Sequence, residues 1–206
     1  MTEFIDLNET KKTTIHLTKP GDYLLFIYNL EKEISIVLAE KVQAQILGLF
    51  IGTNQTQFHI NTAQIHTVPD STSNLLIKGA FFDESEFSYH GQIQIKRQAQ
   101  KSYAYQKNQN LILSPKAKVN SEPFLEIEAN DVFCTHGSTT GKLPQTELQY
   151  LYSRGLSPRQ SEQLLVFGFI REIFAIMRTK AIEEVIIDKY ENAAVNLLEQ
   201  QYAKRQ

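Results

Sequence analysis

Hydrophobic and polar residues alternate with a period of two along much of residues 13–136. Between residues 91 and 97, Ile93 and Ile95 alternate with glutamine and lysine, and residues 125–128 repeat this order with leucine, isoleucine and two glutamates. Such alternation is typical of strands that bury one face. The strands predicted from this pattern span residues 13–18, 23–28, 34–38, 45–51, 57–60, 75–78, 87–95, 110–113 and 124–128.

The predicted strands follow one another at intervals of about ten residues, a spacing that suits a sandwich, a barrel or a solenoid of stacked turns. The chain contains no Asn-Gly or Asp-Gly pair, the dipeptides that mark tight hairpins. The breaks between strands are polar segments such as residues 19–22, 69–73 and 83–85. A parallel β-helix needs bends rather than hairpins, so the turns favour a solenoid, while a sandwich stays open.

The hydrophobic period changes from two to 3.6 after Gly141, and this change predicts helices. A short helix is expected at residues 144–153, followed by Gly155 as a left-handed cap. A second helix is expected after Ser157, whose side chain can cap it. Pro158 suits the first helical position, and Gln160 can complete a capping box with Ser157. We therefore predict two domains, a β-helix over residues 1–141 and a helical domain over residues 142–206.

Two features of the predicted helices concern packing. The second helix is apolar on most faces between Leu164 and Ile176, so neighbouring elements must bury it. A last helix is expected at residues 182–202. Its predicted apolar stripe comprises Ile182, Val185, Ile186, Tyr190, Ala193 and Leu197.

Composition excludes several classes of protein. Of 206 residues, 42% are hydrophobic and 21% are charged, which is typical of a folded globular chain. A net charge of −2 argues against nucleic-acid binding. The single cysteine excludes an internal disulfide and fits a reducing compartment. No apolar run is long enough to span a membrane and the N-terminus lacks a secretion signal, so we expect a cytoplasmic protein without membrane contacts.

Cys134 and His136 are the candidate site residues. In an extended segment their side chains point to the same face, about 7 Å apart. A thiolate and an imidazole together suit a soft metal or sulfur chemistry, although a lone cysteine also packs well in a core. A nucleophile and base pair would need a third, orienting residue, which the sequence does not provide.

Two further activities are disfavoured. Glu126 and Glu128 share a face opposite Leu125 and Ile127, as on the solvent face of a half-buried strand, so a polysaccharide-cleaving carboxylate cluster is not indicated. Residues 137–142 are rich in glycine and end in lysine, but their spacing does not match that of a nucleotide-binding loop. We expect ATP to be handled by a partner.

Four separated motifs resemble a known family. They comprise residues 105–117, 123–128, 131–141, which contain Cys-Thr-His-Gly, and 151–156. Their order and spacing resemble those of the SufB/SufD scaffold family of the SUF iron–sulfur cluster assembly system. The Cys-x-His-Gly motif resembles that of the SufD branch. The strong match covers residues 105–175. The chain is about half the usual family length and lacks the family's N-terminal helical region.

The resemblance implies a mainly β fold, a right-handed parallel β-helix followed by a small helical domain. It implies a non-catalytic SufD-like subunit that pairs through the β-helix with SufB or with itself. The helices would dock the SufC ATPase, with Arg154, Phe169 and Ile170 as candidate contacts, although the second helix also suits a core. No permanent cofactor is implied, but iron or an Fe–S cluster would bind transiently at a subunit interface near Cys134 and His136. The alternative is a β-helix interaction module without a cluster role.

Overall fold

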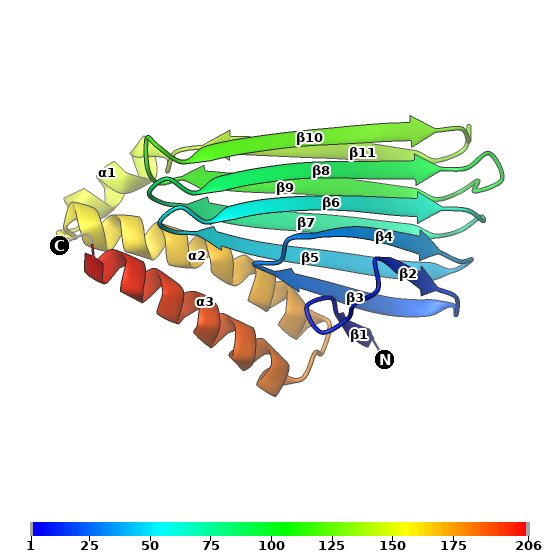
Figure 1. The fold of residues 1–206 in the computed structure, drawn as a ribbon, viewed down its shortest axis with the longest axis horizontal. Helices are drawn as coiled ribbons and strands as arrows, with labels where there is room; N and C mark the ends of the chain where they lie inside the picture. The colour runs from blue at the N-terminus through cyan, green and yellow to red at the C-terminus, as the bar shows by residue number, and fades with distance from the viewer. Residues whose placement is uncertain (1, 205–206) are drawn as a thin grey trace.

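Successive strands alternate between two parallel sheets, so that two strands complete one turn of a β-helix (Figure 1). The structure is a computed structural model that describes residues 2–204. The strands are β1 (Glu3–Asp6), β2 (Thr14–Leu17), β3 (Gly21–Tyr28), β4 (Lys32–Leu38), β5 (Val42–Gly52), β6 (Gln57–His66), β7 (Thr72–Phe81), β8 (Glu86–Ile95), β9 (Tyr103–Ile112), β10 (Lys118–Ile127) and β11 (Phe133–Gly141). The helices are α1 (Gln145–Ser153), α2 (Pro158–Thr179) and α3 (Glu184–Lys204).

The odd-numbered strands form one sheet in the order β1-β3-β5-β7-β9-β11, and the even-numbered strands form the other in the order β10-β8-β6-β4-β2. All neighbouring strands are parallel, which confirms the solenoid and excludes the sandwich. The strand that carries Cys134 and His136 continues through Gly137 and ends at Gly141.

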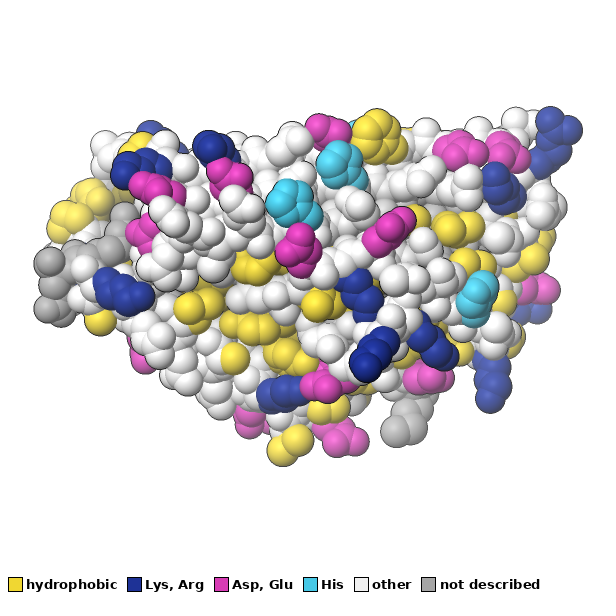
Figure 2. All heavy atoms as spheres, viewed as in Figure 1, with side chains coloured by type: hydrophobic (Ala, Val, Ile, Leu, Met, Phe, Trp, Pro, Cys, Tyr) yellow, Lys and Arg dark blue, Asp and Glu magenta, His cyan; other side chains and the backbone are white. Residues whose placement is uncertain are grey.

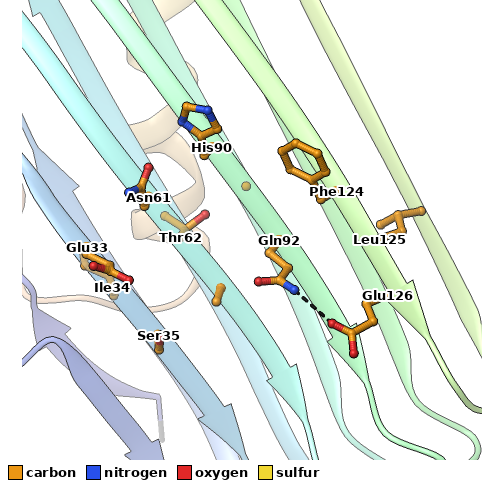
Figure 3. A pocket seen from close by; sticks show the side chains of 12 residues that line it. Glu33, Ile34, Ser35, Asn61, Thr62, His90, Gln92, Phe124, Leu125 and Glu126 are labelled. Carbon is orange, nitrogen blue, oxygen red and sulfur yellow. Dashed lines mark hydrogen bonds between the residues drawn. The ribbon is translucent and has the colours of Figure 1, made fainter.

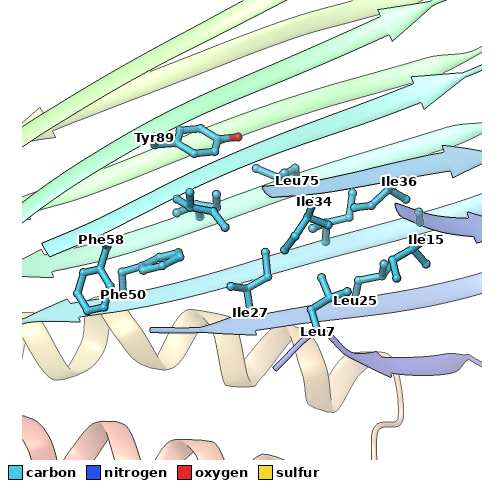
Figure 4. Packing of buried hydrophobic residues seen from close by; sticks show 14 of the residues in the cluster. Leu7, Ile15, Leu25, Ile27, Ile34, Ile36, Phe50, Phe58, Leu75 and Tyr89 are labelled. Carbon is cyan, nitrogen blue, oxygen red and sulfur yellow. The ribbon is translucent and has the colours of Figure 1, made fainter. Parts of the chain in front are cut away.

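Residues stack in columns inside the solenoid because the strands are in register. One column passes from Leu25 through Ile46 and Leu75 to Gln106 and His136. The interior is therefore apolar in the first turns, where the largest core cluster lies (Figure 4), and polar towards β11. This change explains why the sequence pattern missed most of β9, whose inward positions include Gln106 and Asn108 rather than apolar residues.

The helices cover the outer face of the odd-numbered sheet (Figure 1). Apolar side chains of that face, such as Phe26 and Phe82, form a second core cluster with Phe174 of α2 and Tyr190 of α3. The change from strand to helix falls between Gly141 and Gln145. The division into two domains at this point stays a prediction.

The start of α2 confirms the capping box. The Ser157 hydroxyl accepts a hydrogen bond from the Gln160 backbone N–H, and the Gln160 side chain accepts one from the Ser157 backbone N–H. The apolar stripe predicted for the last helix is partly wrong, because Val185 is 77% exposed. The buried side follows Ile187 and Leu198 instead, since the helix has apolar residues at adjacent positions and only the sheet determines which face turns inward.

His66 is fully buried inside the solenoid. Its two ring nitrogens lie 2.7 Å and 2.8 Å from the hydroxyls of Ser71 and Ser73. Burial lowers the pKa of His66 from 6.5 to about 4, so the folded protein holds the ring neutral at neutral pH. The unfolded chain takes up this proton first as the pH falls.

We therefore expect the protein to lose about 2 kcal/mol of unfolding free energy between about pH 6.5 and about pH 5 through His66 alone. Below its unfolded pKa of 6.5, the unfolded state binds more protons than the native state, so stability decreases with decreasing pH. Urea unfolding of the wild type and of His66→Asn across this range measures the difference in slope. An unchanged slope in the variant would show that His66 does not cause the pH dependence.

Candidate functional site

The two ends of the solenoid differ. At the N-terminal end, β1 and β2 have only four residues each, and the segment between them is held by the Lys32 side chain, which donates a hydrogen bond to the Leu7 carbonyl. At the other end, β10 and β11 have ten and nine residues, and each pairs with a neighbour on one side only. We call the surface formed by β10 and β11 the open end; in Figure 1 no element lies beyond it.

Cys134 and His136 both lie on the inner side of β11. Cys134 is in register with Ala104, and His136 is in register with Gln106. Ala104 and Gln106 are buried inside the solenoid. Because no strand follows β11 in the described part of the chain, the same column opens to solvent at His136, which is exposed. The alternation predicted for these two residues thus places both side chains where the solenoid interior meets solvent at the open end, which we call the mouth of the solenoid.

The surroundings of Cys134 favour a protonated thiol. The side chain is half-buried and packs against a small apolar cluster that includes Ile95 and Ala129. This burial raises the pKa of the Cys134 thiol to about 11, because the charged form loses its hydration. Within the isolated chain Cys134 is therefore a poor nucleophile at neutral pH.

The two donors do not form a complete metal site by themselves. Among residues 2–204, no group of three or more His, Cys, Asp and Glu side chains is arranged to hold a metal ion. In the same range the His136 side chain has neither a hydrogen-bond nor an ion-pair partner. Iron in cluster and mononuclear sites takes more ligands than two. Any iron or cluster bound here would need further ligands from outside the chain.

Exposed apolar side chains surround these donors. Leu125 and Ile127 occupy inward positions of β10, in register with Ile93 and Ile95, yet they are 37% and 42% exposed because no turn covers them. On the outer face of β11, opposite to Cys134, Phe133 is also exposed and stacks on Tyr103, with ring centroids 4.7 Å apart. Exposed apolar groups gathered in this way mark an interaction surface.

The other three candidate residues lie in or beside the helices. Arg154 is exposed just after α1, 5.2 Å from the centre of the Tyr150 ring. Ile170 is fully buried against the sheet, so its side chain offers no contact to a partner in this structure. Apolar periodicity alone cannot separate the two uses of an apolar helix, a core and a docking face.

Phe169 has an internal role that the sequence did not indicate. Its ring lies 4.0 Å from the Lys78 ammonium, and its carbonyl accepts a hydrogen bond of 2.9 Å from the same group. Lys78 also forms an ion pair with Glu172. Burial lowers the pKa of Lys78, while Glu172 opposes this effect. The sequence could have indicated this contact between sheet and helix, because Lys78 interrupts an apolar run of β7.

Comparisons with known proteins agree with the geometry. The family model described as "SUF system FeS cluster assembly, SufBD core domain" matches residues 28–169. An iron–sulfur cluster assembly SufBD family protein of Synechocystis is 34% identical over 135 residues, which cover 66% of this chain and 29% of the relative. A SufBD family protein of Mycobacterium tuberculosis is 32% identical over 149 residues, covering 68% and 38%.

A third relative bears the name of a single subunit. The iron–sulfur cluster assembly protein SufD of Escherichia coli is 30% identical over 115 residues, covering 56% of this chain and 27% of that protein. The chain thus spans well under half the length of the curated relatives it matches. No helix within residues 2–204 has the length and apolar character needed to cross a membrane.

Proposed function

The chain belongs to the SufBD core domain family of the SUF system, and from this membership we propose that it acts in iron–sulfur cluster assembly as a SufD-like, non-catalytic scaffold. In this role its β-helix pairs with a SufB-like subunit or with a second copy of the chain. Its helical region docks a SufC-like ATPase. Iron or a nascent cluster is the cargo, bound transiently at the seam between the two β-helices.

The open end is the observation that carries this proposal. It combines unpaired strand edges, exposed apolar side chains and two incomplete ligands on one surface. An unpaired edge presents free backbone N–H and C=O groups to another strand. A partner strand there would cover Leu125 and Ile127 and bring its own donors next to Cys134 and His136.

The two edges of the open end are not equivalent. The Lys118 backbone N–H donates a hydrogen bond to the Ser85 carbonyl of the neighbouring turn. Backbone groups of successive residues point to opposite sides of a strand, so those of Val119 and of every second residue after it point outward. Pro123 occupies one of these outward positions and supplies no N–H. In β11, Phe133 donates to Ser102, so Ser138 is among the residues that face outward. We infer that β11 is the edge through which a partner pairs.

The exposed face of α1 supports docking of an ATPase. The helix has no buried residue, and it presents Tyr150, 58% exposed, beside Arg154. Leu164 at the start of α2 is also exposed. Aromatic and arginine side chains are enriched at interfaces. In the proposed complex Arg154 contacts the ATPase directly, Phe169 holds α2 against Lys78, and Ile170 supports the helix from within.

The ligand role of the open end makes a direct prediction. His136→Ala is expected to lower cluster formation about tenfold while the complex still assembles, because the metal loses one ligand but the strands still pair. Cys134→Ser is expected to act in the same direction. Visible absorbance of clusters formed on the complex with SufB-like and SufC-like partners measures the effect.

His16→Ala is the matched control, because His16 is exposed on β2, far from the open end. The alternative function, a β-helix interaction module without a cluster role, predicts that all three variants behave like the wild type. Equal cluster formation in His136→Ala and His16→Ala, with the complex intact, would therefore favour that alternative.

A further inference from the structure

A groove of about 620 Å³ lies on the outer face of the even-numbered sheet, across β4, β6, β8 and β10 (Figure 3). The helices cover the other sheet, so this face is open to solvent. The side chains around the groove that matter for binding are Glu33, Asn61, His90, Gln92, Phe124 and Glu126. Its volume is in the range of sites that hold a small ligand or a few residues of a peptide.

The depth of the groove comes from a change in side-chain size across the sheet. Ser35 of β4 and Ala63 of β6 are in register and form a low floor. Longer side chains stand on either side, among them His90 and Phe124. The floor crosses two strands without a bulky residue, which leaves room for an extended chain.

The charge of the groove is negative. Its lining contains the carboxylates of Glu33 and Glu126 and no lysine or arginine. The Glu126 Oε2 atom accepts hydrogen bonds of 3.2 Å and 2.8 Å from the amides of Gln92 and Gln94. Its Oε1 atom lies 3.5 Å from the Lys96 ammonium, which stands outside the lining and also pairs with Glu128. Within residues 2–204 the Glu33 carboxylate has neither a hydrogen-bond nor an ion-pair partner. Figure 2 shows acidic and histidine side chains close together on this face. Such a surface repels phosphate-bearing ligands and attracts cations.

Two aromatic rings line the groove, that of His90 on β8 and that of Phe124 on β10. The His90 and Phe124 rings are nearly parallel, with 5° between their planes and 6.5 Å between their centres. His90 is fixed by Glu122, 2.9 Å from its Nε2 atom. Phe124 is 54% exposed, which is unusual for a large apolar residue on an open sheet face. A guanidinium group can lay its plane on such a ring and form two parallel hydrogen bonds to a carboxylate at the same time, whereas an ammonium group contacts both only as a point charge.

The spacing of the carboxylates indicates the length of the occupant. Glu33 on β4 is paired through Asn61 and His90 with Glu122 on β10. Glu126 lies four residues after Glu122 on the same strand, so it is three strands and four residues away from Glu33. At about 4.8 Å per strand and 3.3 Å per residue, the two positions are roughly 20 Å apart. An extended chain covers this distance in about six residues.

We propose that this groove binds an extended polypeptide segment carrying two arginines about six residues apart, one paired with Glu33 and the other with Glu126 beside the Phe124 ring. The groove shares β10 with the open end, but its binding side chains stand on the outer face of the even-numbered sheet, whereas Cys134 and His136 lie on the inner side of β11. The proposal therefore does not depend on the proposed function.

Fluorescence polarisation with a labelled decapeptide tests the proposal. The probe carries arginines at its second and eighth positions on a Gly-Ser background, and companion peptides carry lysine or glutamate at both positions. We expect the arginine peptide to bind at least about tenfold more tightly than the glutamate peptide and a few-fold more tightly than the lysine peptide. The double variant Glu33→Gln, Glu126→Gln is expected to weaken binding about tenfold, and Phe124→Ser about fivefold.

Glu183→Gln is the matched control, since Glu183 is an exposed glutamate beside α3, outside the groove. Circular dichroism confirms that each variant is folded. Equal affinity of the arginine and glutamate peptides, or unchanged binding by the double variant, would overturn the proposal. A neutral glucose oligosaccharide serves as a competitor of different chemistry, and binding of this sugar without binding of the arginine peptide would also overturn it.

Discussion

Phe26→Ala is expected to reduce the unfolding free energy by about 3–5 kcal/mol. Phe26 is fully buried on the outer face of β3, where its ring centre lies 4.9 Å from that of Tyr190 in α3 and 6.4 Å from that of Phe174 in α2. The substitution leaves a cavity at the point where the sheet and both helices meet, and the surrounding backbone is too constrained by its strand neighbours to close it. Urea unfolding followed by circular dichroism measures the loss.

Phe133→Ala provides the comparison for this experiment. Phe133 is 53% exposed at the open end, so its truncation removes little buried surface and is expected to cost less than about 1 kcal/mol. Equal costs for the two substitutions would mean that the helices do not pack on the sheet through Phe26. A loss of helical signal before strand signal in Phe26→Ala would identify the helices as the first part to detach.

Local sequence patterns predicted those parts of the fold that depend on neighbouring residues. The alternation around Ile93 and Ile95 sets which face of β8 turns inward, and that face is indeed buried. The capping box of Ser157 and Gln160 involves four consecutive residues and forms as predicted. In both cases the deciding interactions lie within a single strand or a single helical turn.

The corners of the solenoid could not be predicted in this way. Lys41, Asp70 and Lys101 all adopt left-handed backbone angles and lie one above another, with backbone hydrogen bonds from Lys41 to Asp70 and from Asp70 to Gln100. They recur about every thirty residues, once per turn. Lysine and aspartate do not mark such positions as glycine does, so only the stacking of turns reveals the repeat.

The candidate site was partly predictable. The spacing of Cys134 and His136 was enough to place both side chains on one face, which the register confirms. Their position at the mouth of the interior depends on which strand is last, and that is a property of the whole stack. The groove around Glu33 and Phe124 joins residues about ninety positions apart, because parallel turns bring distant strands side by side. No local pattern contains that information.

Ser138→Pro is expected to weaken pairing of the β-helix with a SufB-like partner or a second copy at least about a hundredfold. The backbone N–H of Ser138 faces outward from β11, so proline there removes no hydrogen bond to β9. Its ring instead blocks an approaching strand and removes one of the few free donors on that edge. Pro123 already occupies the equivalent kind of position in β10, which indicates that the solenoid tolerates the ring. Sedimentation velocity, alone and with the partner, measures the association.

Ser138→Ala separates this effect from the loss of the side chain, because the Ser138 hydroxyl bonds to that of Ser121 across the mouth, 3.0 Å away. The alanine variant is expected to pair like the wild type, since the outward backbone donor is intact. If both variants associate normally, the partner does not add a strand to β11, and the exposed apolar groups of β10 become the remaining contact. If neither variant associates, the hydrogen bond between the Ser138 and Ser121 hydroxyls is itself required for pairing. The partner then contacts the inward-facing side chains of the open end rather than the backbone edge of β11.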